Sequence, residues 1–202
     1  FSIFHRVSVG DRGTEADVAQ AGIKQVAAGY IMYGSSTLMV FTTGEGVQGF
    51  TLDPTIGAFL LSHPNMTIPK RGRYYSVNEG NRMLWDDGFR RYITHLQLPD
   101  KENGRPYKSR YVGSMIADVH RTLLYGGVFA YPSDSENPHG KLRLMYEANP
   151  MAFIIEQAGG RATDGSRRIM DIEPHDIHQR TPVILGSEDD VLEAEAFIAG
   201  RR

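Results

Sequence analysis

The stretch KLRLMYEANPMAFIIEQAGG, residues 141–160, changes from one kind of periodicity to another within a few positions. Its first part, 141–146, predicts a strand, and 150–157 predicts a helix that ends at two glycines. Asn149 is the expected helix N-cap, and Pro150 takes the first helical position, where its missing N–H costs nothing. A strand that leads directly into a helix is typical of layered α/β domains.

Glu147 lies where this predicted strand gives way to the helix. Open α/β sheets bind ligands at such strand ends. A carboxylate there suits Mg²⁺, which takes one or two carboxylates together with phosphate oxygens. The alternative is structural, because a carboxylate beside a helix N-terminus stabilises the helix dipole. The local sequence leaves both interpretations open, and the structural one is the more frequent.

The remainder of the C-terminal part alternates helices and strands. Helical spacing occurs over 82–97 and 114–125, and a closing helix is predicted over 188–199. Short strands are predicted over 128–131 and 182–186. This alternation favours a layered α/β sandwich for residues 70–202.

Residues 1–69 are predicted to form a different unit, the remainder of an α+β domain. A strand is predicted over 1–9 and a helix over 16–29. Three further strands, joined by turns of glycine, aspartate and proline, predict an antiparallel meander; they cover 37–43, 47–52 and 58–62. Because the chain starts without methionine in an apolar, strand-like run, we expect it to continue a longer sequence.

Composition excludes several classes of protein. The 202 residues carry a net charge of −2 without blocks of like charge, which gives no support for nucleic-acid or membrane-surface binding. There is no cysteine, so disulfides, thiolate metal sites and a cysteine nucleophile are excluded. No apolar run approaches the length of a membrane span, and no signal peptide is visible. These features fit a cytoplasmic protein.

Two polar stretches could bind an anion. Arg110, Tyr111, Gly113 and Ser114 gather just before the predicted helix at 114–125. Exposed N–H groups at a helix start, together with a guanidinium and hydroxyls, are suited to phosphate. A capped helix beside an exposed arginine is the ordinary alternative.

The second stretch is built from residues at strand ends. Asn78 follows a short strand and could donate its amide to a phosphate oxygen or simply form a turn. Tyr131 ends one predicted strand and Lys141 begins the next, so a phenol and an ammonium group could form an anion cradle. His175 and His178 lack the spacing and the neighbours of a zinc site, and we interpret them as surface or subunit-contact residues.

Taken together, these motifs resemble the class I fructose-1,6-bisphosphatases. The matching segments occur in order over nearly the whole chain: AAGY (27–30), YGSS (33–36), LDP (52–54), SVNEG (76–80), RYVGSM (110–115), DVHRTL (118–123), GKLRL (140–144), YEANPMA (146–152) and DIHQR (176–180). The resemblance implies hydrolysis of the 1-phosphate of fructose 1,6-bisphosphate with Mg²⁺ or Mn²⁺, in a gluconeogenic, cytoplasmic homotetramer.

The resemblance also assigns roles to particular residues. It places the sugar and its retained 6-phosphate on a set of eight residues: Asn78, Arg110, Tyr111, Gly113, Ser114, Met115, Tyr131 and Lys141. In this family the arginine at the position of Arg110 reaches into a neighbouring subunit's site. Glu147 matches a metal ligand beside the 1-phosphate. Asn81 stands where the animal enzymes have a tyrosine that touches the 6-phosphate, so this donor is altered.

One part of the family pattern is not within residues 1–202. The acidic block Asp-Pro-Leu-Asp-Gly-Ser-Ser-Asn, which supplies most metal ligands in the family, is expected before Phe1. Without it we expect the chain as given to be inactive, since one glutamate cannot hold Mg²⁺. Two alternatives stay open: sedoheptulose 1,7-bisphosphate as a substrate, alone or together with fructose 1,6-bisphosphate, and a sugar-phosphate-binding module without catalysis.

Overall fold

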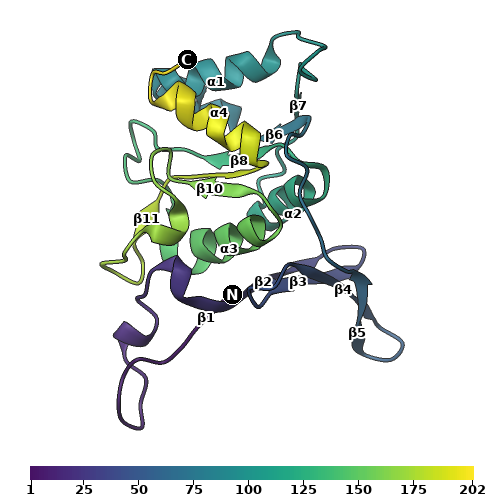
Figure 1. Cartoon of the computed structure of the whole chain (residues 1–202), viewed down its shortest axis with the longest axis vertical. Coiled ribbons are helices and arrows are strands. Elements are labelled where there is room, and N and C mark those ends of the chain that lie inside the picture. Colours follow the sequence, from purple (N-terminus) through teal and green to yellow (C-terminus); the bar gives the residue numbers. More distant parts are fainter.

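The computed structural model describes all residues 1–202 and shows four layers (Figure 1). Helices α1 (Asp87–Gln97) and α4 (Glu188–Ile198) form the first layer, above a five-stranded sheet. Helices α2 (Met115–Tyr125) and α3 (Asn149–Gln157) lie between that sheet and a second one. The layered α/β architecture predicted from the sequence is confirmed.

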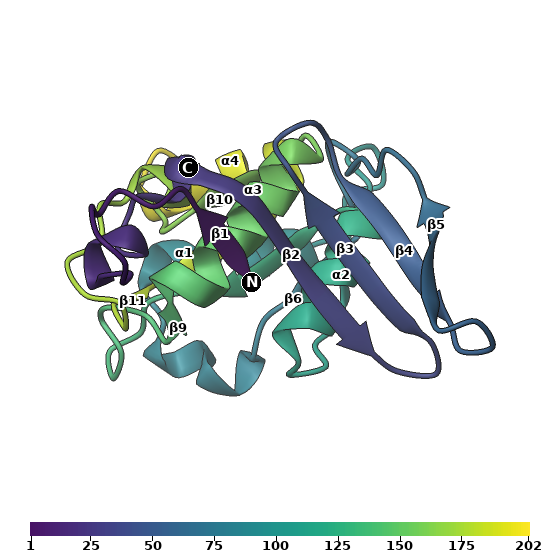
Figure 2. The same ribbon diagram turned by 90° about the horizontal axis from the view of Figure 1, so that it is seen from below.

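The N-terminal sheet is a continuous antiparallel meander in the order β1-β2-β3-β4-β5. Its strands are β1 (Ser2–Phe4), β2 (Gln25–Tyr33), β3 (Thr37–Thr42), β4 (Gln48–Asp53) and β5 (Ala58–His63). Figure 2 looks onto the face of this sheet that is turned away from the helices. On that face Phe41 and Phe50 stack with their ring centroids 5.4 Å apart, and Leu61 is about half exposed.

The C-terminal sheet has the order β10-β12-β8-β6-β7 and mixes parallel with antiparallel pairs. Its strands are β6 (Tyr74–Ser76), β7 (Lys108–Ser109), β8 (Val128–Tyr131), β10 (Arg161–Thr163) and β12 (Val183–Gly186). A separate two-stranded ladder joins β9 (Leu142–Arg143) to β11 (Arg180–Thr181). Short 3₁₀ helices cover Glu15–Asp17, Gly22–Lys24, Glu79–Leu84 and Ile169–Asp171.

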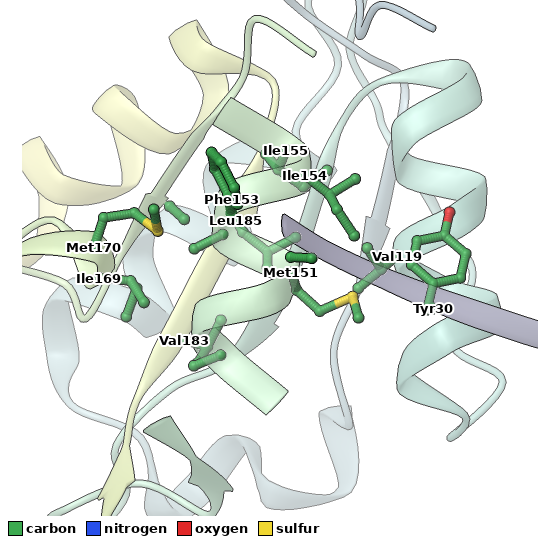
Figure 3. Packing of buried hydrophobic residues seen from close by; sticks show 14 of the residues in the cluster. Tyr30, Val119, Met151, Phe153, Ile154, Ile155, Ile169, Met170, Val183 and Leu185 are labelled. Carbon is green, nitrogen blue, oxygen red and sulfur yellow. The ribbon is translucent and has the colours of Figure 1, made fainter. Parts of the chain in front are cut away.

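The larger hydrophobic core joins both sheets through α3. Met151 on this helix packs in one cluster with Tyr30 of β2 and Leu185 of β12, as Figure 3 shows. Helix α3 can serve both sheets because Pro150 and the apolar residues through Ile155 are all buried. A smaller core holds α1 and α4 against the other face of the C-terminal sheet. The predicted units 1–69 and 70–202 therefore share one core.

The predicted helix over 16–29 is wrong. Its first part contains only two single-turn 3₁₀ helices, and Gln25–Tyr33 is the longest strand of the protein. The apolar spacing fits a helix locally, but β2 forms hydrogen bonds with both β1 and β3 and buries Ala28 and Tyr30 on one face. Pairing along two edges outweighs local periodicity, and Gly29 weakens any helix here.

Two details of the 141–160 stretch also need correction. The strand is limited to Leu142–Arg143, and a π-helical turn over Leu144–Ala148 connects it to α3. Because the helical conformation begins before Asn149, that residue has helical dihedrals and does not cap the helix. The strand predicted over 1–9 is likewise shortened to Ser2–Phe4. No helix of the structure has both the length and the apolar surface needed to cross a membrane.

Candidate functional site

Two phenols from different elements meet at the end of the C-terminal sheet. Tyr131 is the last residue of β8, and its hydroxyl lies 2.9 Å from the hydroxyl of Tyr111 in the loop before α2. Burial, followed by the hydrogen bond with Tyr131, raises the pKa of the Tyr111 phenol. The Tyr111 phenol is therefore neutral near pH 7. One phenol donates to the other, which leaves one hydroxyl hydrogen available to a ligand.

Asn78 lies in the same small hollow as Tyr131. Its side-chain oxygen accepts a hydrogen bond from the N–H of Gly80 and so starts the 3₁₀ helix Glu79–Leu84. This use of the oxygen turns the amide –NH₂ into the free end of the side chain, and that end can only donate. The two interpretations drawn from the sequence, turn and phosphate donor, are thus compatible. Asn81 lines the hollow as well.

Lys141 reaches this hollow through Asp134, which is one of its lining residues. The ammonium lies 3.9 Å from the Asp134 carboxylate, whose side chain is almost fully buried. Burial raises the pKa of Asp134, but hydrogen bonds from Asn137 and the charge of Lys141 together hold it below its ordinary value. The carboxylate is therefore ionised at neutral pH, and its charge attracts the ammonium of Lys141.

Gly140 fixes where Lys141 begins. Its φ is +74°, and a Cβ at this position would come within 2.3 Å of backbone atoms of Thr181 and Pro182. Only glycine combines that backbone angle with such a close approach. The ladder between β9 and β11 can then form immediately after Lys141.

The loop before α2 carries the other predicted ligands of the sugar. Gly113 has φ of +82°, Ser114 is exposed at the helix start, and Met115 is half-buried against the larger core. Arg110 does not join the two phenols: its side chain is exposed, with the guanidinium 5.9 Å from the centroid of the Tyr74 ring. The structure thus gathers Asn78, Tyr111, Tyr131 and Lys141, and it turns Arg110 outward.

Glu147 projects from the π-helical turn and not from a strand end. Its carboxylate accepts the N–H of Arg143 at 2.7 Å and lies 3.8 Å from the guanidinium of that residue. No group of three histidine, aspartate or glutamate side chains is arranged to hold a metal ion within residues 1–202. One carboxylate, already engaged with its own turn, does not make a magnesium site. The residues present here therefore do not fit a complete metal centre.

The side chain of His178 contacts a neighbouring tyrosine. Its Nδ1 lies 3.0 Å from the Tyr146 hydroxyl, and the two rings meet edge to face. The largest cleft, about 570 Å³, lies near His175 and Arg180 but contains none of the predicted substrate residues. The hollow at Tyr131 is small, about 10 Å³. We take the polar groups in and around it as the candidate site, because most of them are hydrogen-bond donors suited to an anion.

Comparison with known proteins identifies the family. Residues 68–199 match the family model described as the fructose-1-6-bisphosphatase C-terminal domain, and residues 1–64 match the N-terminal domain model. The chain belongs to the fructose-1,6-bisphosphatase family. The two matches meet near the linker between β5 and β6.

Class 1 fructose-1,6-bisphosphatases of bacteria are similar over the whole chain. The enzyme of Chloroherpeton thalassium is 60% identical over 203 residues, which cover 100% of this chain and 58% of the relative. That of Chlorobium phaeobacteroides is 59% identical, covering 100% and 61%. That of Cytophaga hutchinsonii is 60% identical, covering 98% and 57%. The chain spans about three fifths of the length of these fructose-1,6-bisphosphatases.

Sequence reasoning missed three residues of this candidate site. Asp134 holds Lys141, and two residues of α2, Asp118 and Arg121, contact the loop that carries Tyr111. The DVHRTL motif contains both helix residues, but their role depends on which segments fold against α2. A signal was present, since a charged side chain inside an amphipathic helix needs a partner when it is buried.

Proposed function

We propose that the whole protein removes the 1-phosphate of fructose 1,6-bisphosphate, and that the polar groups around the hollow beside Tyr131 bind the 6-phosphate end of the substrate at its rim. The observation that supports this best is the convergence of the paired phenols with Asn78 and Lys141. One ammonium, one free hydroxyl hydrogen and one amide –NH₂ supply donors for a phosphate dianion, and the Asp134 carboxylate balances the ammonium when no phosphate is bound.

Binding of the 6-phosphate changes the partner of Lys141. In the structure the lysine is balanced by Asp134 alone. The phosphate adds negative charge beside a lysine that the buried aspartate already orients. Binding therefore costs little side-chain conformational entropy at Lys141. Because this phosphate is not the one transferred, its binding serves to orient the sugar.

A division of labour along the chain is part of the proposal. Residues 1–69 form the remainder of the N-terminal phosphatase domain, and 70–202 form the substrate-binding α/β domain. Arg110 is exposed, so its side chain is accessible to another subunit. The proposal includes a homotetramer in which Arg110 completes a neighbour's phosphate site. Gly113, Ser114 and Met115 line the sugar at the start of α2.

Fructose-1,6-bisphosphatases use divalent metal ions, and we propose Mg²⁺ or Mn²⁺ for the whole protein. When bound, such an ion stabilises charge on the transferring phosphoryl group. Glu147 is our candidate for one ligand, and it would have to exchange its hydrogen bond with Arg143 for the metal. Residues 1–202 contain no group that completes the coordination shell, so no catalytic step is assigned to them.

The proposal is tested with the whole protein by comparing fructose 1,6-bisphosphate with sedoheptulose 1,7-bisphosphate. We expect inorganic phosphate and fructose 6-phosphate from the first, with the larger kcat/KM. Tyr131→Phe should weaken fructose 6-phosphate binding by about tenfold, as expected for one hydrogen bond to a charged group. The control Tyr33→Phe alters an exposed phenol and should bind normally. Preference for the seven-carbon sugar, or fructose 1-phosphate as product, would overturn the substrate assignment.

A further inference from the structure

Helix α2 buries a pair of opposite charges on its inner face. The Asp118 side chain has no exposed surface, and the Arg121 side chain is about four-fifths buried. They are three residues apart, so they lie on the same side of the helix and form an ion pair. Neither residue lines the hollow at Tyr131, and the proposed chemistry does not use them directly.

Asp118 holds the loop that precedes its own helix. Its carboxylate accepts the N–H of Val112 at 3.1 Å and that of Gly113 at 3.2 Å. The Ser114 side chain makes no capping hydrogen bond, and the Asp118 carboxylate binds N–H groups of the loop before the helix instead. The carboxylate thereby fixes the backbone directly after Tyr111, which is one of the paired phenols.

Arg121 links that loop to a second segment of the site. Its Nη2 group donates to the carbonyl oxygen of Arg110 at 2.5 Å and to the hydroxyl of Ser76 at 2.6 Å. Ser76 ends β6, two residues before Asn78. One guanidinium therefore joins the strand that leads to Asn78 with the loop that presents Tyr111.

The link depends on the Nη2 group of Arg121. The Nε atom of Arg121 is buried and makes no hydrogen bond. The guanidinium is thus held through Nη2 by Asp118 and by the two segments that it joins. A buried N–H without a protein partner destabilises the fold unless water reaches it, so the contacts of Nη2 must offset that cost.

We infer that Asp118 and Arg121 are positioning residues that hold the Tyr111 loop and the Asn78 turn at a fixed separation, so that both can contact one phosphate. This inference rests on the proposed function of the hollow. Neither residue touches the ligand. Their effect is to keep the donors at hydrogen-bonding distance from the same phosphate oxygens, where small displacements reduce affinity strongly.

The test uses Asp118→Asn and Arg121→Lys in the whole protein. Asparagine keeps the shape and one accepting oxygen but loses the charge that holds Arg121. The lysine ammonium is one bond closer to the main chain than Nη2, so it cannot reach both Ser76 and the Arg110 carbonyl from the same position. We expect KM and the dissociation constant of fructose 6-phosphate to rise about tenfold, with a smaller change in kcat. Hydrogen exchange should quicken at the amides of Val112 and Gly113.

A matched control is the ion pair of Arg161 with Glu195, where a largely buried carboxylate also meets a guanidinium, at 3.1 Å. It joins β10 to α4 and contacts none of the site residues. Glu195→Gln should lower the melting temperature without raising KM or the fructose 6-phosphate dissociation constant. If it raises them as much as Asp118→Asn does, the effect is general loss of stability and the inference is wrong.

Lys141→Ala separates this inference from the proposed function. If Lys141→Ala weakens fructose 6-phosphate binding while Asp118→Asn and Arg121→Lys, both folded, bind normally, the positioning role is refuted and the phosphate site stands. If Lys141→Ala leaves binding unchanged, the phosphate site itself is wrong and the inference falls with it. Parallel losses in all three variants, with Glu195→Gln unaffected, support both.

Discussion

Replacement of Lys141 by alanine is the most direct test of the phosphate hollow. The ammonium is the only cation that the structure pairs with Asp134, at 3.9 Å. A hydrogen bond between charged groups contributes about 1.5–3 kcal/mol, which corresponds to an affinity loss of roughly 10- to 100-fold for a 6-phosphate. Because the group transferred is the other phosphate, KM should rise more than kcat falls.

The same variant should change the acid stability of the protein. Asp134 has a folded-state pKa below its ordinary value, so it adds stability above the unfolded-state pKa of about 4, and this stability is lost as pH falls through the folded-state value. Removing Lys141 removes one of the influences that lower this pKa. Lys141→Ala should therefore be less stable than wild type at pH 7, and this difference in stability should vanish at low pH.

Calorimetric titration with fructose 6-phosphate and steady-state kinetics measure the loss of affinity. Thermal unfolding between about pH 3 and pH 7 measures the change in acid stability, because this range includes the ordinary carboxyl pKa. Lys101→Ala is the matched control, because Lys101 is exposed in the loop after α1. A variant with lowered kcat but unchanged KM and unchanged fructose 6-phosphate affinity would refute the assignment of Lys141 to the phosphate.

Three further predictions test other parts of the structure. In the whole protein, Glu147→Gln should lower kcat by about a hundredfold or more at saturating metal while fructose 6-phosphate binding persists; near-normal turnover would remove Glu147 from the metal shell. The polypeptide 1–202 alone should release phosphate at background rate with Mg²⁺ or Mn²⁺, since it holds no three-ligand group; robust turnover would assign the chemistry to residues such as His175. Met151→Ala should cost about 2–5 kcal/mol in urea unfolding, because Met151 is 2% exposed in the core that joins both sheets; a cost below about 1 kcal/mol would show that α3 does not couple them.

The sequence by itself determined the elements whose own residues dictate their conformation. The strand Val128–Tyr131 and the helix Met115–Tyr125 were predicted to within a residue, because a run of buried apolar residues and a one-turn spacing leave few alternatives. The order of the motifs was also sufficient to indicate the family, and to predict that Asn78, Tyr131 and Lys141 serve one site.

Tertiary structure decided what depends on segments distant in the chain. Residues 16–29 have helical spacing, but their second part belongs to the strand Gln25–Tyr33, because β1 and β3 offer this strand hydrogen bonds on both edges. Glu147 was expected at a strand end, but a turn closed by its own carboxylate carries it. Asp118 and Arg121 show the same limit: local pattern identifies them as charged helix residues. Only packing shows that one guanidinium joins two loops, since contacts between residues 76, 110 and 121 exist only after the chain has folded.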